Sequence, residues 1–193
     1  IGNVLTAERI DLIIGNKKRI ESIIIEVINE KFSGGAERII GGNEFIIRDI
    51  LVAYVMKILR ADRTIAPIDI LDLEAVYTFP VSVSSGGSDI AVLAGGKVDR
   101  IDLIQEITRI VDYKTGSVAE KITSIEDLFA GNRKKDTDAW LQTLLYCEAY
   151  LMNNKAAVVR PSVYKVRKLT SESDNDRLKI GGNSKSEISV DNY

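Results

Sequence analysis

The stretch KVDRIDLIQEITRIVDYK, residues 97–114, contains two runs of branched residues separated by a polar pair. The runs, residues 97–103 and 108–114, are rich in Val and Ile, which favour β-strands. A hairpin with Gln105 and Glu106 at its tip is the simplest connection between them. Because Gln-Glu is a poor two-residue turn, we expect a somewhat longer loop there. The stretch predicts two adjacent strands of a sheet.

Three charged residues of this hairpin need an explanation. Asp112 and Lys114 are two residues apart in a strand, so they project to the same face. A symmetric hairpin places Asp99 opposite Asp112, with the two Cβ atoms roughly 4.5–5.5 Å apart. Two carboxylates that close repel each other unless a cation lies between them or one is protonated. Mg²⁺ suits this position because it accepts one or two carboxylates and takes its other ligands from water and phosphate.

The spacing alone leaves a second interpretation open. A shift of the register by one residue moves Asp99 to the opposite face of the hairpin. Independently of the register, the simpler interpretation is that Asp99, Arg100 and Asp102 form a solvated strand face. Asp112 and Lys114 then form an ion pair of little energetic value.

Hydrophobic periodicity predicts the elements on either side of the hairpin. Two amphipathic helices are expected before it, the second with Asn43 as its N-cap. The predicted inward faces are Ile20, Ile23, Ile24, Val27 and Ile28 for the first helix, and Ile47, Ile50, Leu51, Tyr54, Val55 and Ile58 for the second.

Further elements complete the predicted fold. Alternation from Ala75 to Val83 predicts a strand, with Pro80 at an edge or bulge, followed by a turn at SSGGSD and the apolar stretch 90–93. A helix is expected from about Thr137, capped by Asp136 or Thr137, and a last strand within residues 157–169. The inward residues of this helix are predicted to be Trp140, Leu141, Leu144 and Leu145. The predicted fold class is α/β (α+β), a central mixed sheet flanked by helices.

The composition excludes several kinds of site. The chain has 193 residues, one cysteine, Cys147, and no histidine. Disulfides within the chain, Cys/His zinc sites and His-dependent catalytic triads are therefore excluded. A net charge of −2 means that any nucleic-acid site must rest on local basic patches. No signal peptide and no run of membrane-spanning length is present, so we expect a cytoplasmic protein without membrane contact.

Three motifs carry a resemblance to a known family. The segments GGKVDRID, IVDYKTG and LQTLLYCEAYL occur in this order between residues 95 and 151. Together they resemble the RecB-type branch of the PD-(D/E)XK nuclease superfamily, which includes AddB-like helicase–nuclease subunits and Cas4-like exonucleases. The resemblance spans roughly residues 68–168 and implies a restriction-endonuclease-like core.

The resemblance also implies roles for five residues. Asp99 and Asp112 correspond to metal ligands for Mg²⁺ or Mn²⁺, and Lys114 to the residue that orients or activates the attacking water. Gln142 and Tyr146 correspond to the Q-x-x-x-Y motif, whose members line the active site of relatives. The implied activity is metal-dependent hydrolysis of DNA, by an exonuclease, within a helicase–nuclease or a repair and recombination protein.

The chain departs from the family in two respects. Many relatives have an upstream histidine that binds metal, and this chain has none. Either that segment precedes Ile1 in a longer protein, which we favour, or Glu26 or Glu30 replaces it, or the domain is inactive. Some relatives also bind an iron–sulfur cluster through four cysteines, whereas the single Cys147 is expected to be a small core residue.

Basic residues suggest where DNA would be held. Arg133, Lys134 and Lys135 precede the helix of Gln142, and a helix N-terminus with basic neighbours favours phosphate. Lys165, Arg167 and Lys168 form a second basic group. A solvated loop and an ordinary strand end explain the two groups equally well.

The sequence also suggests a division of the chain. We expect one nuclease domain over residues 1–169, with a helical part over 1–60 and a catalytic core over 68–168. Residues 170–193 are polar and are expected to form a peripheral tail. The expected partners are DNA and a helicase subunit or domain. An inactive nuclease-like module with a structural or DNA-binding role is the alternative.

Overall fold

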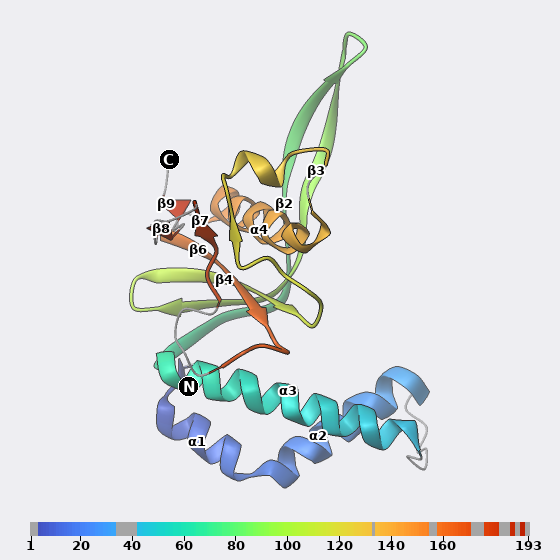
Figure 1. Cartoon of the computed structure of the whole chain (residues 1–193), viewed down its shortest axis with the longest axis vertical. Coiled ribbons are helices and arrows are strands. Elements are labelled where there is room, and N and C mark those ends of the chain that lie inside the picture. The colour runs from blue at the N-terminus through green and yellow to red at the C-terminus, as the bar shows by residue number, and fades with distance from the viewer. Residues whose placement is uncertain are drawn as a thin grey trace. The chain divides into compact units, whose positions relative to one another are not determined.

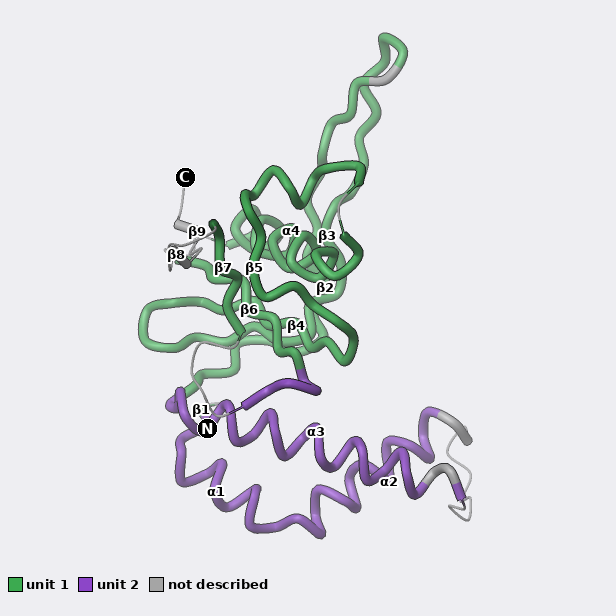
Figure 2. The backbone as a smooth tube through the Cα atoms, viewed as in Figure 1, with its two compact units in different colours: residues 1–4, 68–165, 174–193 green, residues 5–67, 166–173 purple. Residues whose placement is uncertain are grey.

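The computed structural model describes residues 4–33, 42–132, 134–154, 158–170, 176–181, 186–187 and 190–191. The chain divides into two compact units (Figure 2). Unit 1 comprises Ile1–Val4, Ile68–Lys165 and Asp174–Tyr193, and unit 2 comprises Leu5–Pro67 and Val166–Ser173. No helix among the described residues is both long and apolar enough to span a membrane.

Unit 2 is built from three helices, α1 (Ala7–Gly15), α2 (Lys17–Ser33) and α3 (Asn43–Ile65). The side chain of Thr6 caps α1 by accepting a hydrogen bond from the backbone N–H of Arg9. The helix α3 starts at Asn43 and has Gly42 as its N-cap, so the prediction of Asn43 as N-cap is wrong by one residue.

The core of unit 2 uses only part of each predicted helix face. Its buried members are Ile20, Ile24, Ile28 and Val52. Ile23 and Val27 were predicted to face inward on α2, but 43% and 47% of their surfaces are exposed. Half of the face predicted for α3 is also wrong, because Ile47, Ile50 and Leu51 are exposed, whereas Tyr54, Val55 and Ile58 are partly buried. Val52 takes their place against α2, together with the partly buried Val55, Met56 and Leu59.

Unit 1 is organised around a mixed sheet with the strand order β1-β2-β3-β4-β6-β9 (Figure 1). Its strands are β1 (Val4–Leu5), β2 (Ile68–Ser85), β3 (Ser88–Ile104), β4 (Ile107–Lys114), β6 (Val158–Lys165) and β9 (Val190–Asp191). The pairs β2–β3, β3–β4 and β6–β9 are antiparallel, whereas β4 and β6 are parallel. A parallel pair requires a long crossover, which here contains α4 (Asp138–Asn153). The predicted mixed sheet with flanking helices is confirmed.

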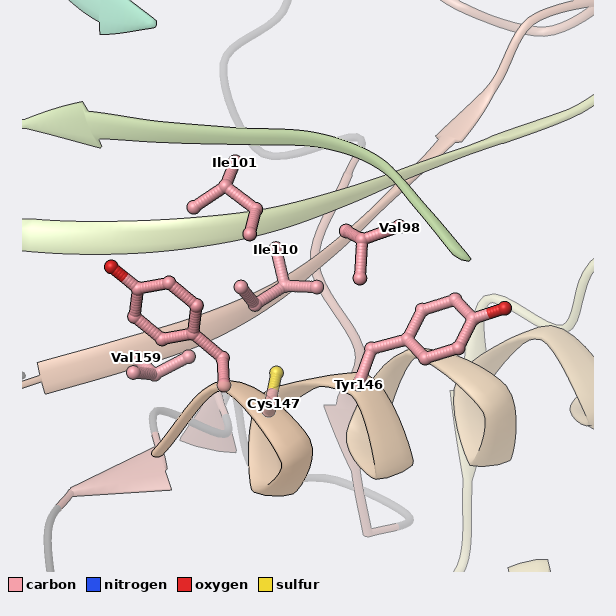
Figure 3. Packing of buried hydrophobic residues seen from close by; sticks show 7 residues of the cluster. Val98, Ile101, Ile110, Tyr146, Cys147 and Val159 are labelled. Atoms are coloured by element: carbon pink, nitrogen blue, oxygen red, sulfur yellow. The ribbon is translucent and has the colours of Figure 1, made fainter. Parts of the chain in front are cut away.

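The helix α4 provides the main cover of this sheet. Tyr146 and Cys147 point from α4 toward Val98, Ile101 and Ile110 of the strands (Figure 3). A second cluster surrounds Trp140, which is fully buried and whose indole N–H donates to the carbonyl of Ala119 at 2.7 Å. Leu145 was expected to face inward, but it is 37% exposed.

The hairpin of β2 and β3 is longer than predicted. The two strands pair from Asp69–Leu103 to Ser85–Ser88, with one register shift between Ile70 and Asp72, so residues 90–93 and 97–103 belong to one strand, β3. Gly86 and Gly87 form the turn within the predicted SSGGSD segment, both with positive φ. At Gly95, where φ is +116°, a Cβ atom would lie 2.3 Å from the carbonyl oxygen of Tyr77, so the close pairing requires glycine.

The hairpin of β3 and β4 has the predicted tip. Ile104 pairs with Ile107, which leaves Gln105 and Glu106 as a two-residue turn. The expectation of a longer loop is therefore wrong. In the two-residue turn, Gln105 adopts the left-handed backbone conformation, with φ of +57°, which is uncommon for residues other than glycine.

A smaller sheet of three short strands completes unit 1. It consists of β5 (Lys121–Ile122), β7 (Lys179–Ile180) and β8 (Ser186–Glu187). Leu178 is buried in the cluster of Trp140, and β9 pairs with β6. The described residues from Asp176 onward therefore pack into unit 1, where the sequence predicted a peripheral segment.

Candidate active site

The end of the β3–β4 ladder brings Asp99 and Asp112 together. The register runs from Ile104–Ile107 to Arg100–Val111, so the ladder stops directly beside these two residues. Asp99 Oδ2 accepts a hydrogen bond of 2.9 Å from the backbone N–H of Tyr113. The charge of Asp99 is close enough to raise the pKa of the Asp112 carboxyl. This arrangement agrees with the predicted register rather than with one shifted by a residue.

A distortion of β3 occurs at the same place. The β2–β3 register passes from Leu73–Arg100 to Ala75–Val98, and the intervening Glu74 has a positive φ of +55°. Val98 and Ile101 both belong to the core cluster under α4, although residues three apart point to opposite faces in a regular strand. Asp99 lies between these two residues, so it stands in the irregular part of β3.

Asp112 is a buried carboxylate with an adjacent lysine. Only 3% of its surface is exposed, and Lys114 Nζ lies 3.0 Å from both of its oxygens. Lys114 donates a hydrogen bond to Oδ1 of Asp112. The buried Oδ2 accepts no hydrogen bond of good geometry, although the Lys114 ammonium is close to it. Burial is the main cause that raises the pKa of Asp112, with the charge of Lys114 acting in the opposite direction.

Lys114 connects this carboxylate to α4. Its ammonium donates a second hydrogen bond, of 2.9 Å, to Oε1 of Gln142. The amide nitrogen of Gln142 donates in turn to the hydroxyl of Tyr146 at 2.6 Å. Tyr146 approaches β3 at Gly96, where a Cβ atom would lie 3.3 Å from the hydroxyl. A continuous chain of polar contacts therefore runs from Asp112 through Lys114 and Gln142 to Tyr146.

A groove of about 230 Å³ opens beside this chain of contacts. Gln142 and Tyr146 line it, together with Gly95, Asp138 and two half-buried or exposed leucines of α4, Leu141 and Leu145. Both residues of the predicted Q-x-x-x-Y motif thus border this groove.

A comparison with protein families decides the classification. The model of the PD-(D/E)XK nuclease superfamily matches residues 14–189. The chain belongs to this superfamily. No curated protein matches the chain significantly.

The donor atoms present fit a divalent cation of the kind that PD-(D/E)XK nucleases use. Carboxylate oxygens are the preferred ligands of Mg²⁺ and Mn²⁺, and Asp112 offers a buried oxygen without a hydrogen bond. Asp99 adds a second negative charge beside it. Within the described ranges, no group of three or more His, Cys, Asp or Glu side chains is positioned to share a metal ion. Any remaining ligands would be water and phosphate oxygens.

The structure separates the basic residues that the sequence grouped together. Arg133 lies outside the described residues, and Lys134 and Lys135 are exposed just before α4. Of the second group, Lys165 is only 5% exposed. The prediction that Lys165 contributes to an exposed basic patch is therefore wrong, since Lys165 is the last residue of β6 and pairs with Lys114 of β4.

A buried charge cluster on the other face of the sheet was not predicted. Arg109 and Asp102 are both fully buried and form two hydrogen bonds of 2.8 Å with each other. Arg109 also donates to Asp176 at 3.3 Å, and the hydroxyl of Ser162 donates to the same carboxylate. The interpretation of Arg100 and Asp102 as a solvated strand face is wrong, since 4% and 0% of their surfaces are exposed.

A signal for this cluster exists in the sequence. Arg109 lies in a run of branched residues that was predicted to form a strand next to another strand. A charged side chain that is buried in such a strand requires a buried partner. Burial on its own lowers the pKa of the Arg109 guanidinium, but Tyr164 and Asp102 outweigh it and raise the pKa overall. The guanidinium therefore remains charged.

Proposed function

We propose that this chain is the nuclease domain of a metal-dependent enzyme that hydrolyses phosphodiester bonds in DNA, as RecB-type exonucleases do. The observation that carries the proposal is the connected set formed by Asp112, Lys114, Gln142 and Tyr146, with Asp99 beside it. These five side chains come from β3, β4 and α4, and membership of a nuclease superfamily supports their use in catalysis.

Asp99 and Asp112 would hold Mg²⁺ or Mn²⁺, which supplies charge neutralisation at the phosphate and favours ionisation of the attacking water. Lys114 has three N–H donors, and Asp112 and Gln142 occupy two of them. The third donor is available to the attacking water or to a phosphate oxygen. Lys114 would thus orient the nucleophile while its two acceptors hold the ammonium in place.

Gln142 and Tyr146 would position the lysine and the substrate. The hydroxyl of Tyr146 accepts a hydrogen bond from Gln142, so its own proton remains available to an oxygen of the DNA backbone. The groove beside them gives the backbone access to that hydroxyl.

The proposal is tested by cleavage of linear DNA in the presence of Mg²⁺. Asp112→Asn and Lys114→Ala are each expected to lower the rate by at least about 100-fold, because each removes charge at the reacting phosphate. Lys97→Ala is the matched control, since Lys97 is an exposed lysine of β3 that pairs with Glu74. Circular dichroism should show that all three variants fold. Full cleavage by both Asp112→Asn and Lys114→Ala would refute the assignment.

Cleavage of circular DNA tests the narrower proposal of an exonuclease. An exonuclease requires a DNA end, so a closed circular strand is expected to resist the enzyme while the linear form of the same strand is degraded. Equal degradation of both forms would identify an endonuclease instead. A helicase partner and a cytoplasmic location remain predictions from the sequence.

One observation favours the alternative of an inactive module. The sequence contains no histidine, and the upstream histidine ligand of many relatives is therefore absent from this chain. Glu26 on α2 accepts a hydrogen bond from Ser22, and Glu30 follows one turn later, exposed. If either glutamate replaces the histidine, Glu26→Gln or Glu30→Gln will weaken Mn²⁺ binding in a calorimetric titration. Mn²⁺ binding that is absent even from the unmodified chain would support the inactive module.

A further inference from the structure

Two adjacent glycines of β3, Gly95 and Gly96, precede Asp99, and they lack side chains for different reasons. At Gly95 a Cβ atom would meet the backbone of Tyr77, so the pairing of β2 with β3 requires glycine there. At Gly96 a Cβ atom would instead meet the end of the Tyr146 ring, with Cε1 at 3.2 Å, the hydroxyl at 3.3 Å and Cζ at 3.7 Å. Tyr146 thus occupies the space that a side chain of residue 96 would need.

The ring of Tyr146 has little freedom to move away from Gly96. Only 7% of the surface of Tyr146 is exposed, and its ring belongs to the core cluster with Val98 and Cys147 (Figure 3). Protein cores are close-packed, and carbon atoms in ordinary contact lie about 3.5–4.0 Å apart. A methyl group on residue 96 would therefore have to displace the hydroxyl end of Tyr146 or the strand β3 itself.

The position of the Tyr146 hydroxyl determines the orientation of Gln142. Gln142 Oε1 accepts a hydrogen bond of 2.9 Å from Lys114, and its amide nitrogen donates one of 2.6 Å to the hydroxyl. An ammonium group can only donate, so the amide oxygen must face Lys114 and the amide nitrogen must face Tyr146. A displaced hydroxyl would turn this amide and weaken its hold on the ammonium of Lys114.

We propose that Gly96 is a positioning residue of the candidate active site. It leaves room for the hydroxyl end of Tyr146 against β3, and the hydroxyl in turn fixes Gln142 and, through it, Lys114. Gly96 acts through Tyr146 and has no side chain with which to contact the substrate. The inference deepens the proposed nuclease function, on which its consequence for catalysis rests.

The side-chain amide of Gln142 reports on this connection without any need for cleavage. Its signals in a ¹H–¹⁵N correlation spectrum of the metal-free full chain are identified by their loss in Gln142→Glu. Gly96→Ala is expected to shift these signals in the same direction as Tyr146→Phe does, because both variants disturb the hydroxyl that the amide contacts. Gly131→Ala is the matched control, since Gly131 is exposed and a Cβ atom there would meet nothing within 4 Å. Unchanged Gln142 signals in Gly96→Ala would overturn the proposal.

Cleavage kinetics test the consequence for catalysis. At saturating DNA we expect Gly96→Ala to lower kcat about 10-fold, because small displacements of positioning groups are costly. The double variant Gly96→Ala/Tyr146→Phe should be no slower than Tyr146→Phe, since both changes break the same connection. Calorimetry should show that Gly96→Ala leaves the affinity for Mn²⁺ unchanged. Effects on kcat that multiply, or a weakened affinity for Mn²⁺, would contradict the inference, because Gly96 would then act independently of Tyr146 or through the nearby Asp99.

Melting temperatures keep the inference testable if Gly96→Ala folds poorly. Gly96→Ala is expected to lower the melting temperature by at least about 3 °C more in the unmodified chain than in a Tyr146→Leu background, where the ring end is absent. The φ of +158° at Gly96 is common to both backgrounds, so the difference reports on the contact with Tyr146. Equal losses in both backgrounds would refute the contact. If the unmodified chain cleaves no DNA, the nuclease proposal fails, whereas the amide signals and melting temperatures still decide whether Gly96 positions Tyr146 and Gln142.

Discussion

Cys147 shows how strongly a single side chain is determined by its surroundings. It lies on α4 in the cluster with Ile101 and Ile110, and only 1% of its surface is exposed (Figure 3). Burial raises the pKa of its thiol, with the charge of Glu148 acting in the same direction. The residue is therefore a core side chain, as predicted, and its thiolate is disfavoured in the folded chain.

The reactivity of this thiol is a direct test of the core around α4. Because Cys147 is the only cysteine, alkylation by iodoacetamide reports on one position. At pH 8 we expect the native chain to react at least about 100-fold more slowly than the chain in urea, since only the thiolate reacts and burial raises its pKa. Mass spectrometry measures both rates. Similar rates would show that α4 does not cover the sheet in solution.

At the scale of the element, α2 and α3 carry more apolar surface than their mutual packing uses. The face of α2 toward α3 consists of Ile20, Ile24 and Ile28, spaced four residues apart. Ile23 and Val27 follow the same helical period and were predicted to be inside, but they lie at the side of the contact. Periodicity identifies an amphipathic helix without showing how wide its buried face is.

Neighbouring isoleucines of α2 provide a matched pair. Ile24→Ala removes a side chain that is 8% exposed and is expected to lower the free energy of unfolding by about 2–4 kcal/mol. Ile23→Ala removes one that is 43% exposed and should cost less than about 1 kcal/mol. Urea denaturation measures both values. The reverse order would mean that α2 presents a different face to α3.

At the scale of the molecule, buried charges join distant segments of unit 1. Asp102 comes from β3, Arg109 from β4, and Asp176 from the segment that follows β6. Asp176 also accepts a hydrogen bond from Ser162 and, through its carbonyl, from the backbone N–H of Val163 at 2.9 Å. The C-terminal segment is thereby attached to the central strands by buried polar contacts as well as by Leu178.

Loss of one charge from this cluster is expected to destabilise the fold severely. Asp102→Asn leaves the buried Arg109 without its bidentate partner, which should cost about 3–5 kcal/mol in the free energy of unfolding. Glu74→Gln breaks an exposed ion pair with Lys97 and should cost less than about 1 kcal/mol. Thermal and urea denaturation of both variants provide the comparison. A cost near zero for Asp102→Asn would mean that Asp176 alone is sufficient to balance the buried charge of Arg109.

Features that depend on neighbouring residues could be predicted from the sequence alone. Asp112 and Lys114 share a face because strands alternate, and Gln142 and Tyr146 lie one turn apart because helices repeat every 3.6 residues. The order of the motifs was sufficient for the superfamily. The hairpin between β3 and β4 was also predictable, because its two strands are adjacent in the chain.

Only the tertiary structure decided which of these local patterns meet. The contact of Lys114 with Gln142 joins residues 28 positions apart, and it depends on how α4 crosses the sheet. The same holds for the burial of Arg109 against Asp176 and for the choice of Ile24 over Ile23. Such outcomes follow from close packing between distant segments, since each buried side chain must find its complement there. Local periodicity contains no information about that complement.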